Sequence, residues 1–71
     1  MTHEEKIALL EEVFEEEAGT ITPDLKLEQL YLDSLAVLEL IAVINERFGK
    51  QLDGAQIESF ETVQDILSVM E

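Results

Sequence analysis

Asp33, Ser34 and Leu35 are the residues of this chain whose types and spacing are best suited to chemistry. They open the longest apolar-rich stretch of the sequence, and the side chain of Asp33 or Ser34 is suited to cap a helix that starts there. A serine at a helix start is exposed, and the positive end of the helix dipole favours an attached phosphate. The pattern predicts a modification site at Ser34, and a serine that only caps the helix is the alternative.

Ser34 lacks the partners of a catalytic nucleophile. Such a serine needs a base and a third group that orients the base, and the single histidine, His3, lies at the beginning of the sequence. No Gly-x-Ser-x-Gly turn surrounds Ser34. A bundle of 71 residues also offers little room for an enclosed pocket. We therefore expect a protein that is not an enzyme by itself.

The carboxylates do not form a metal-binding motif. Asp24 and Asp53 do not begin the spaced acidic loop of an EF-hand. The chain has no cysteine, which excludes disulfides, zinc–thiolate sites and a thiol nucleophile. We expect no dedicated metal site and interpret the carboxylates as a solvated surface.

The net charge of −13 comes from 17 acidic and 4 basic residues. This charge disfavours nucleic acids and anionic lipid surfaces as partners, and it favours proteins that present lysine and arginine. No apolar run approaches the roughly 20 residues of a membrane span, and the first five residues lack the pattern of a signal peptide. We expect a monomeric cytoplasmic protein with no stable membrane insertion.

Apolar residues at helical spacing predict three main helices. Thr2 and Glu5 form a capping box before a helix from His3 to about Glu17, which Gly19 would end. Its solvent side would carry Glu11, Glu12, Glu15, Glu16 and Glu17.

A second helix is predicted from Ser34 to Phe48, ending at Gly49. A third is predicted from about Glu61 or Thr62 to Met70, and it would bury Val63, Ile66, Leu67 and Met70.

The remaining segments predict short turns. Residues 19–33 form a long connection whose leucines would pin it to the core, with a turn of helix at Leu27–Leu30. Another short helical turn is expected at Ala55–Ser59. Strand alternation is absent from the sequence. We therefore expect one all-α domain over residues 1–71, a small four-helix bundle of three main helices and one short helix.

The segment 34–48 carries two apolar stripes. One stripe would face the core and consists of Leu40, Ile41, Ile44 and Phe48, with Val37 above them. The other consists of Leu35, Leu38 and Ala42. Because a helix that is apolar nearly all round is either central or contacts a partner, the second stripe predicts a partner surface.

From Asp33 onward the chain resembles an acyl carrier protein. Residues 33–40 resemble the family's D-S-L-x-x-V/L-E-L motif, residues 46–48 followed by Leu52 resemble its E-x-F…I pattern, and residues 60–64 resemble its I-x-T-V-x segment. The acidic first helix, the Thr22-Pro23 loop and Leu30 also fit. The resemblance spans essentially the whole chain.

This resemblance implies a 4′-phosphopantetheine arm on Ser34, flanked by Asp33 and Leu35, whose thiol carries acyl groups as thioesters. A phosphopantetheinyl transferase would install the arm with the help of Asp33. Ketosynthases, acyltransferases and reductases of fatty-acid, polyketide or related lipid biosynthesis would be further partners. The docking face would consist of Leu35, Leu38, Glu39, Ala42 and Glu46. The interior that could receive the acyl chain would consist of Leu40, Ile41, Ile44, Phe48, Leu52, Ile57 and Phe60.

Two departures from the family pattern favour specialised partners. Tyr31 and Leu32 stand where the family usually has glycine and a small residue, and their bulk would reshape the entrance to the arm site or add a partner contact. The 34–48 helix is also less acidic than is usual in fatty-acid carriers, and Arg47 adds a positive charge. Two other functions fit the sequence: a peptidyl or aminoacyl carrier, and a helix-docking module without an arm.

Overall fold

The computed structural model describes residues 1–30 and 32–70. In these residues the chain forms no strand and four α-helices: α1 (His3–Val13), α2 (Ser34–Phe48), α3 (Gly54–Ser59) and α4 (Val63–Val69). One turn of 3-10 helix, η1, spans Leu27–Gln29. The predicted all-α bundle of three main helices and one short helix is confirmed. Tyr31, which was expected to shape the entrance to the arm site, lies outside the described residues.

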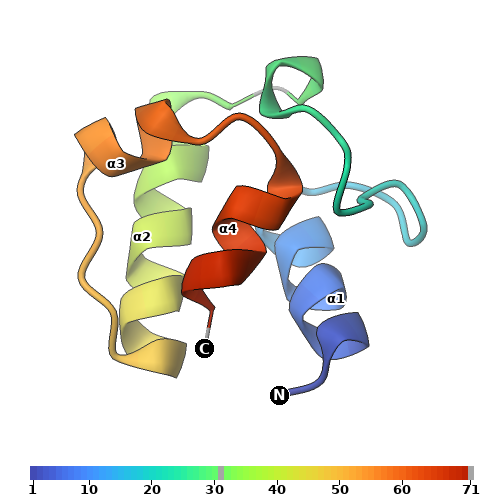
Figure 1. The fold of residues 1–71 in the computed structure, drawn as a ribbon, viewed down its shortest axis with the longest axis horizontal. Coiled ribbons are helices and arrows are strands. Elements are labelled where there is room, and N and C mark those ends of the chain that lie inside the picture. Colours follow the sequence, from blue (N-terminus) through green and yellow to red (C-terminus); the bar gives the residue numbers. More distant parts are fainter. Residues whose placement is uncertain (31, 71) are drawn as a thin grey trace.

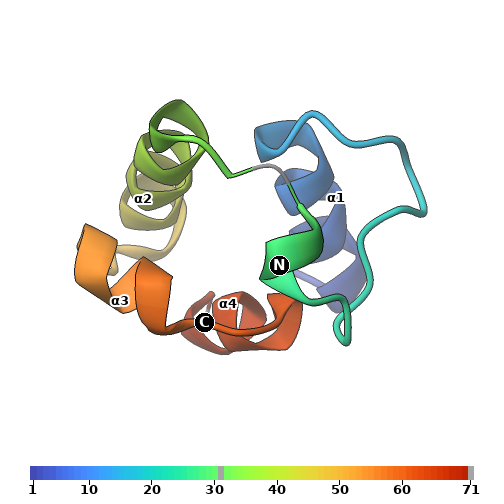
Figure 2. The ribbon, with the colours of Figure 1, turned by 90° about the horizontal axis from the view of Figure 1, so that it is seen from above.

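The three longer helices surround one core. α1 and α2 contact each other and run in opposite directions (Figure 1). α4 lies in a second layer and crosses one side of this pair (Figure 2). Seen from above, α3 lies against α2 and continues into α4 (Figure 2). The end of α1 and the beginning of α2 therefore lie at the same end of the bundle, at the top in Figure 1.

The core draws on every helix. Its most deeply buried side chains come from α1, α2 and the α4 region: Leu10, Leu40, Ile44, Val63, Ile66 and Met70. Of the interior residues predicted from sequence, Leu40, Ile44 and Ile57 are buried, and the remaining four are half-buried against the core: Ile41, Phe48, Leu52 and Phe60. The leucines of the long connection pack there too, with Leu27 and Leu30 buried.

α2 has the predicted bounds because both of its ends carry strong signals. The Asp33 side chain caps the beginning by accepting the Ala36 N–H at 2.8 Å. At the other end Gly49 has φ 67°, a left-handed conformation that glycine adopts without a steric penalty. The Gly49 N–H donates to the Asn45 carbonyl and closes the last turn.

The prediction that the first helix reaches Glu17 is wrong, because α1 ends at Val13. The Glu16 N–H donates to the Glu11 carbonyl, and the Glu15 N–H donates to the Glu12 carbonyl. These two hydrogen bonds form a Schellman motif at the end of the helix. Glu15 holds the left-handed position with φ 55°. A longer helix would bury nothing more, because no apolar side chain follows Phe14 before Ala18, whereas the early turn brings Ile21 back into the core.

The expectation that Glu11 faces solvent is also wrong, because this residue is buried. Its Oε2 accepts the Gly19 N–H at 2.6 Å and the Ile21 N–H at 3.4 Å. A buried carboxylate needs such donors, since an uncompensated buried charge is costly. Glu11 therefore links the start of the long connection to α1. The helical spacing of the sequence did not indicate this role, because it placed Glu11 on the solvent side.

The long connection is paired to the segment before α4. The Leu27 N–H donates to the Glu61 carbonyl at 2.9 Å, and the Val63 N–H donates to the Leu25 carbonyl at 3.0 Å. Lys26 and Thr62 thus form an isolated antiparallel bridge. These bonds satisfy backbone groups that would otherwise be unpaired beside the core, and they hold a long connection whose one helical element in the described residues is the single turn η1.

We expect Ile44→Ala to lower the free energy of unfolding by about 2–5 kcal/mol, because Ile44 is fully buried and the deletion leaves a cavity between the helices. Chemical denaturation monitored by circular dichroism measures the change. Asn45→Ala is the matched control on the exposed side of α2 and should change stability by no more than about 0.5 kcal/mol. Equal effects of the two substitutions would contradict this core.

We expect Asp65→Asn to destabilise the protein at neutral pH and to lose this effect in acid. The backbone N–H groups of Glu61 and then Thr62 donate to Asp65 Oδ2 and lower the pKa of this carboxyl. A carboxyl whose pKa is lower in the folded protein than in the unfolded chain stabilises the fold at pH values above its unfolded pKa of about 3.9. This stabilisation disappears as the pH falls through the pKa of the folded protein. Melting temperatures of both proteins from pH 7 to pH 2 should therefore converge. A constant difference would contradict this role of Asp65.

Candidate functional site

Ser34 is the first residue of α2, and its side chain is exposed. The preceding residue, Asp33, supplies the helix cap through its Oδ1 atom. The sequence left open which of the two side chains caps the helix, and the structure assigns the cap to Asp33. Because Ser34 begins α2, it lies at the end of the bundle where α1 ends and α2 begins (Figure 1).

The beginning of α2 suits a phosphate ester on Ser34. The first N–H groups of a helix have no partner within the helix, and the helix dipole places partial positive charge there. Because α2 has 15 residues, this dipole is fully developed, and the exposed hydroxyl leaves room for a flexible substituent. The residues at this position therefore fit a phosphate-linked group.

The second apolar stripe of α2 lies at the surface. Leu35 is 73% exposed and Leu38 is 62% exposed, and apart from the first residue, Met1, they are the exposed large apolar side chains of the described residues. Glu39, Ala42 and Glu46 are exposed as well. The five residues of the predicted docking face thus form an apolar centre with acidic neighbours, on the helix that begins at Ser34.

An open pocket of about 370 Å³ lies beside the first turns of α2. Its apolar lining comes from the long connection, from α2 and from the α3 region: Leu27, Leu30, Leu32, Val37, Ile57 and Phe60. Glu28 and Glu58 also line it. Of this lining, Ile57 and Phe60 were among the residues predicted to form the interior that could receive the acyl chain. Val37 was predicted on the core-facing stripe, and the leucines were expected to pin the connection to the core.

A second cleft, of about 320 Å³, lies on the α1 side of Ser34. The end of α1 contributes Val13, Phe14 and Glu15, and the beginning of α2 contributes Asp33, Leu35, Ala36 and Glu39. Sequence reasoning did not join these two segments, because their contact depends on where α1 ends.

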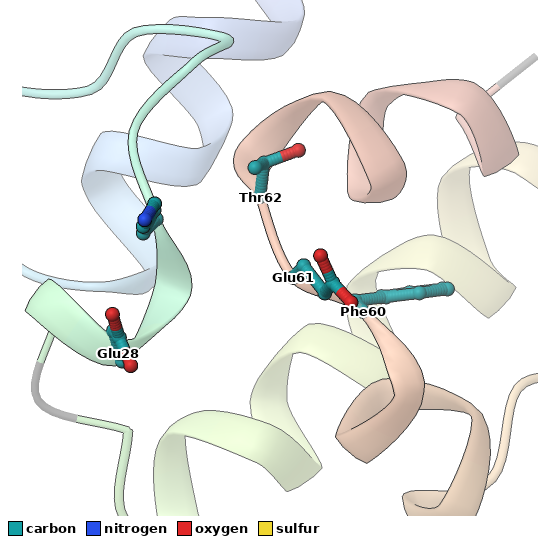
Figure 3. A pocket seen from close by; sticks show the side chains of 5 residues that line it. Glu28, Phe60, Glu61 and Thr62 are labelled. Atoms are coloured by element: carbon teal, nitrogen blue, oxygen red, sulfur yellow. The ribbon is translucent and has the colours of Figure 1, made fainter.

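Another hollow, of about 280 Å³, lies where the long connection pairs with the segment before α4. Figure 3 shows Glu28 on η1, and Phe60, Glu61 and Thr62 on the segment that leads into α4. Lys26 completes the lining. Neither Ser34 nor its immediate neighbours line this hollow, so we assign it to the backbone pairing and not to the site.

The carboxylates of the described residues do not form a metal site. Within residues 1–30 and 32–70, no group of three or more histidine, aspartate or glutamate side chains is arranged to hold a metal ion. No helix in the described part of the chain is long and apolar enough to cross a membrane.

Comparison with known proteins agrees with this geometry. The family model for phosphopantetheine attachment sites matches residues 7–69. An acyl carrier protein of Onion yellows phytoplasma (strain OY-M) is 38% identical over 68 residues, which cover 94% of this chain and 90% of that protein. An acyl carrier protein of Thermobifida fusca (strain YX) is 30% identical over 78 residues, which cover 100% of this chain and 99% of that protein. An acyl carrier protein of Helicobacter hepaticus is 30% identical over 71 residues, which cover 99% of this chain and 93% of that protein.

No solved structure matches the chain. The family match includes α2 and the exposed serine at its beginning, and it extends to the end of α4. The chain therefore belongs to the acyl carrier protein family, and its prosthetic group is phosphopantetheine.

Proposed function

We propose that Ser34 carries the 4′-phosphopantetheine arm and that the protein delivers acyl groups to partner enzymes. The observation that supports this most strongly is the exposed hydroxyl at the beginning of a 15-residue helix, inside the family match. When bound, the arm supplies a thiol that holds acyl groups as thioesters. Residues 1–71 would act as one carrier domain.

Asp33 would assist the transferase that installs the arm. Its Oδ1 holds the first turn of α2 in place by accepting the Ala36 N–H, and its carboxylate also lines the cleft on the α1 side of Ser34. The same side chain would therefore position the serine and offer negative charge to an approaching enzyme or to a cation that accompanies coenzyme A.

Partner enzymes would dock on the exposed stripe of α2. Leu35 and Leu38 supply apolar area that water contacts in the free protein, and the flanking glutamates supply negative charge. Such a surface fits partners with an apolar patch surrounded by lysine and arginine. Transferases, ketosynthases, acyltransferases and reductases of fatty-acid, polyketide or related lipid biosynthesis are the enzymes proposed for it.

The pocket between η1, α2 and α3 would shelter the acyl chain. It lies beside the first turns of α2 and its lining is mostly apolar, with Leu30, Val37 and Phe60 among the residues that a chain would contact. Burying each methylene contributes about 0.8 kcal/mol, so several carbons would offset a modest separation of the helices. Ile44 and Leu40 form the core beneath this region.

The protein would be a non-catalytic, monomeric, cytoplasmic carrier. Ser34 has no histidine near it in sequence, and the one histidine, His3, begins α1 at the opposite end of the bundle (Figure 1). A nucleophilic serine requires a neighbouring base, so the arrangement supports a site of attachment rather than of catalysis.

We expect the purified protein to gain one phosphopantetheine mass when it is incubated with coenzyme A, magnesium and a transferase of broad specificity. Ser34→Ala should gain none, because it lacks the hydroxyl that forms the ester. Intact-protein mass spectrometry measures the gain. Ser59→Ala, which removes an exposed serine from α3, is the control and should load as the wild type does. A wild-type chain that gains no mass would refute the proposal.

We expect Leu38→Asp to weaken binding of the loaded protein to a ketosynthase about tenfold, which corresponds to about 1.4 kcal/mol. The substitution places a charge in the apolar centre of the docking face, and because Leu38 is 62% exposed the fold should remain intact. Surface plasmon resonance measures the affinity. Ala55→Asp adds the same charge on exposed α3 and should leave the affinity unchanged.

The exposed stripe would equally suit a docking module without an arm. Ser34→Ala separates the two functions when the protein is tested in acyl transfer between enzymes. A carrier loses all transfer with this variant, whereas an arm-free module keeps its activity and loses it only with Leu38→Asp.

A further inference from the structure

We propose that Phe60 sets the greatest length of acyl chain that this protein can shelter. The inference rests on the proposed function, because it concerns the apolar pocket between η1, α2 and α3, and it adds a specificity-determining residue to that pocket. Phe60 lines this pocket of about 370 Å³ and also the neighbouring hollow of about 280 Å³. The residue therefore lies where an apolar space and a polar space meet.

The backbone around Phe60 is held from three sides. The Phe60 N–H donates to the Ile57 carbonyl and closes the end of α3. At the next residue, the Glu61 carbonyl accepts the Leu27 N–H at 2.9 Å, and the Glu61 N–H donates to Asp65 Oδ2 at 2.8 Å. These bonds connect the neighbourhood of Phe60 to α3, to the long connection and to α4. We therefore expect this part of the pocket wall to keep its position when an acyl chain enters.

Toward the interior, the ring of Phe60 closes the pocket. Figure 3 shows the ring pointing away from Glu28, and Phe60 packs half-buried against the core. Ile57, which lines the same pocket, is itself part of the buried core. Because protein interiors contain few voids, an acyl chain can extend in this direction only as far as the ring.

Toward the neighbouring hollow, polar surroundings end the apolar pocket. Besides Phe60, the hollow is lined by three charged side chains and one hydroxyl: Lys26, Glu28, Glu61 and Thr62. A methylene group gains free energy on burial only when it leaves water for apolar surroundings, and charged groups are costly to remove from water. Carbons that pass Phe60 on this side would therefore remain hydrated and add no stability.

The two boundaries together predict a limit on the cargo. Each carbon inside the pocket removes apolar area from water, so the stability of the loaded protein should rise with chain length. Beyond Phe60 this gain should stop. The protein therefore shelters completely only chains short enough to end at Phe60, and the terminal carbons of longer chains stay accessible to a partner enzyme.

The test loads the protein with acyl-phosphopantetheine from acyl-coenzyme A thioesters, with straight chains from butanoyl to hexadecanoyl and a transferase of broad specificity. The melting temperature of each acyl form is compared with that of the form carrying the free arm. In the wild type it should rise with chain length and then become constant. With Phe60→Val, which is smaller by about four carbon atoms, the limiting length should increase by about two to four carbons.

Phe14→Val is the matched control. It removes the same atoms from a phenylalanine that lines the cleft on the α1 side of Ser34 and does not line the apolar pocket. This variant should melt lower than the wild type in every form but keep the wild-type limiting length. An equal increase of the limit with Phe14→Val would overturn the inference, because the limit would then reflect a general loosening of the fold.

Phe60→Leu guards against a valine variant that does not fold. Leucine keeps more of the apolar contact with the core, and each acyl form is compared with the free-arm form of the same variant, so that a general loss of stability cancels. The limiting length should increase in this variant too, by about one to three carbons. A limit that stays at the wild-type length in the Phe60 variants would overturn the inference.

The levels of the proposal fail separately. A wild-type chain that accepts no arm would refute the proposed function, and this inference with it. A chain that loads but melts at one temperature whatever the acyl length would refute the apolar pocket as the shelter. A loaded wild type whose melting temperature continues to rise up to hexadecanoyl would refute only the limit set by Phe60.

Discussion

The cap at the beginning of α2 is the interaction on which the site depends. A helix start needs an acceptor for its free N–H groups, and a serine that met this need with its own side chain would be tied to the backbone. Here Asp33 accepts the Ala36 N–H, and Ser34 follows it as the first helical residue with an exposed side chain. Two adjacent residues therefore divide two tasks, one stabilising the helix and the other presenting a hydroxyl. Motion of this helix start would move the proposed attachment point, Ser34.

The rest of the fold holds α2 in place while leaving one of its faces free. Leu40 and Ile44 anchor the helix in a core completed by α1 and the α4 region, and Leu35 and Leu38 remain in water. So small a domain cannot bury every apolar stripe of a central helix. The exposed stripe costs stability in the free protein, and a docked partner would recover that cost by covering it.

The long connection contains the single turn η1, and polar contacts hold it against the helices. Glu11 accepts the N–H groups of Gly19 and Ile21 at its beginning, and backbone bonds to Glu61 and Val63 hold its second half. These contacts shape the cleft and the pocket near Ser34. The early turn after Val13 forms one side of the cleft between α1 and α2, and the leucines of the connection line the apolar pocket. The same region of the bundle thus combines the exposed side chain of Ser34, a cleft lined by carboxylates and an apolar pocket.

The sequence by itself determined the helices whose signals are local. Asp33 before an apolar run and Gly49 after it set the bounds of α2, and the motif around Ser34 identified the family, because capping and periodicity act within a few residues. The end of α1 and the burial of Glu11 were decided only by the tertiary structure. A run of glutamates has helical propensity in every position, so local energies do not distinguish a helix that stops at Val13 from one that reaches Glu17. The choice depends on bringing Ile21 into the core and on giving the Glu11 carboxylate two backbone donors, contacts that exist only after the chain has turned back on itself.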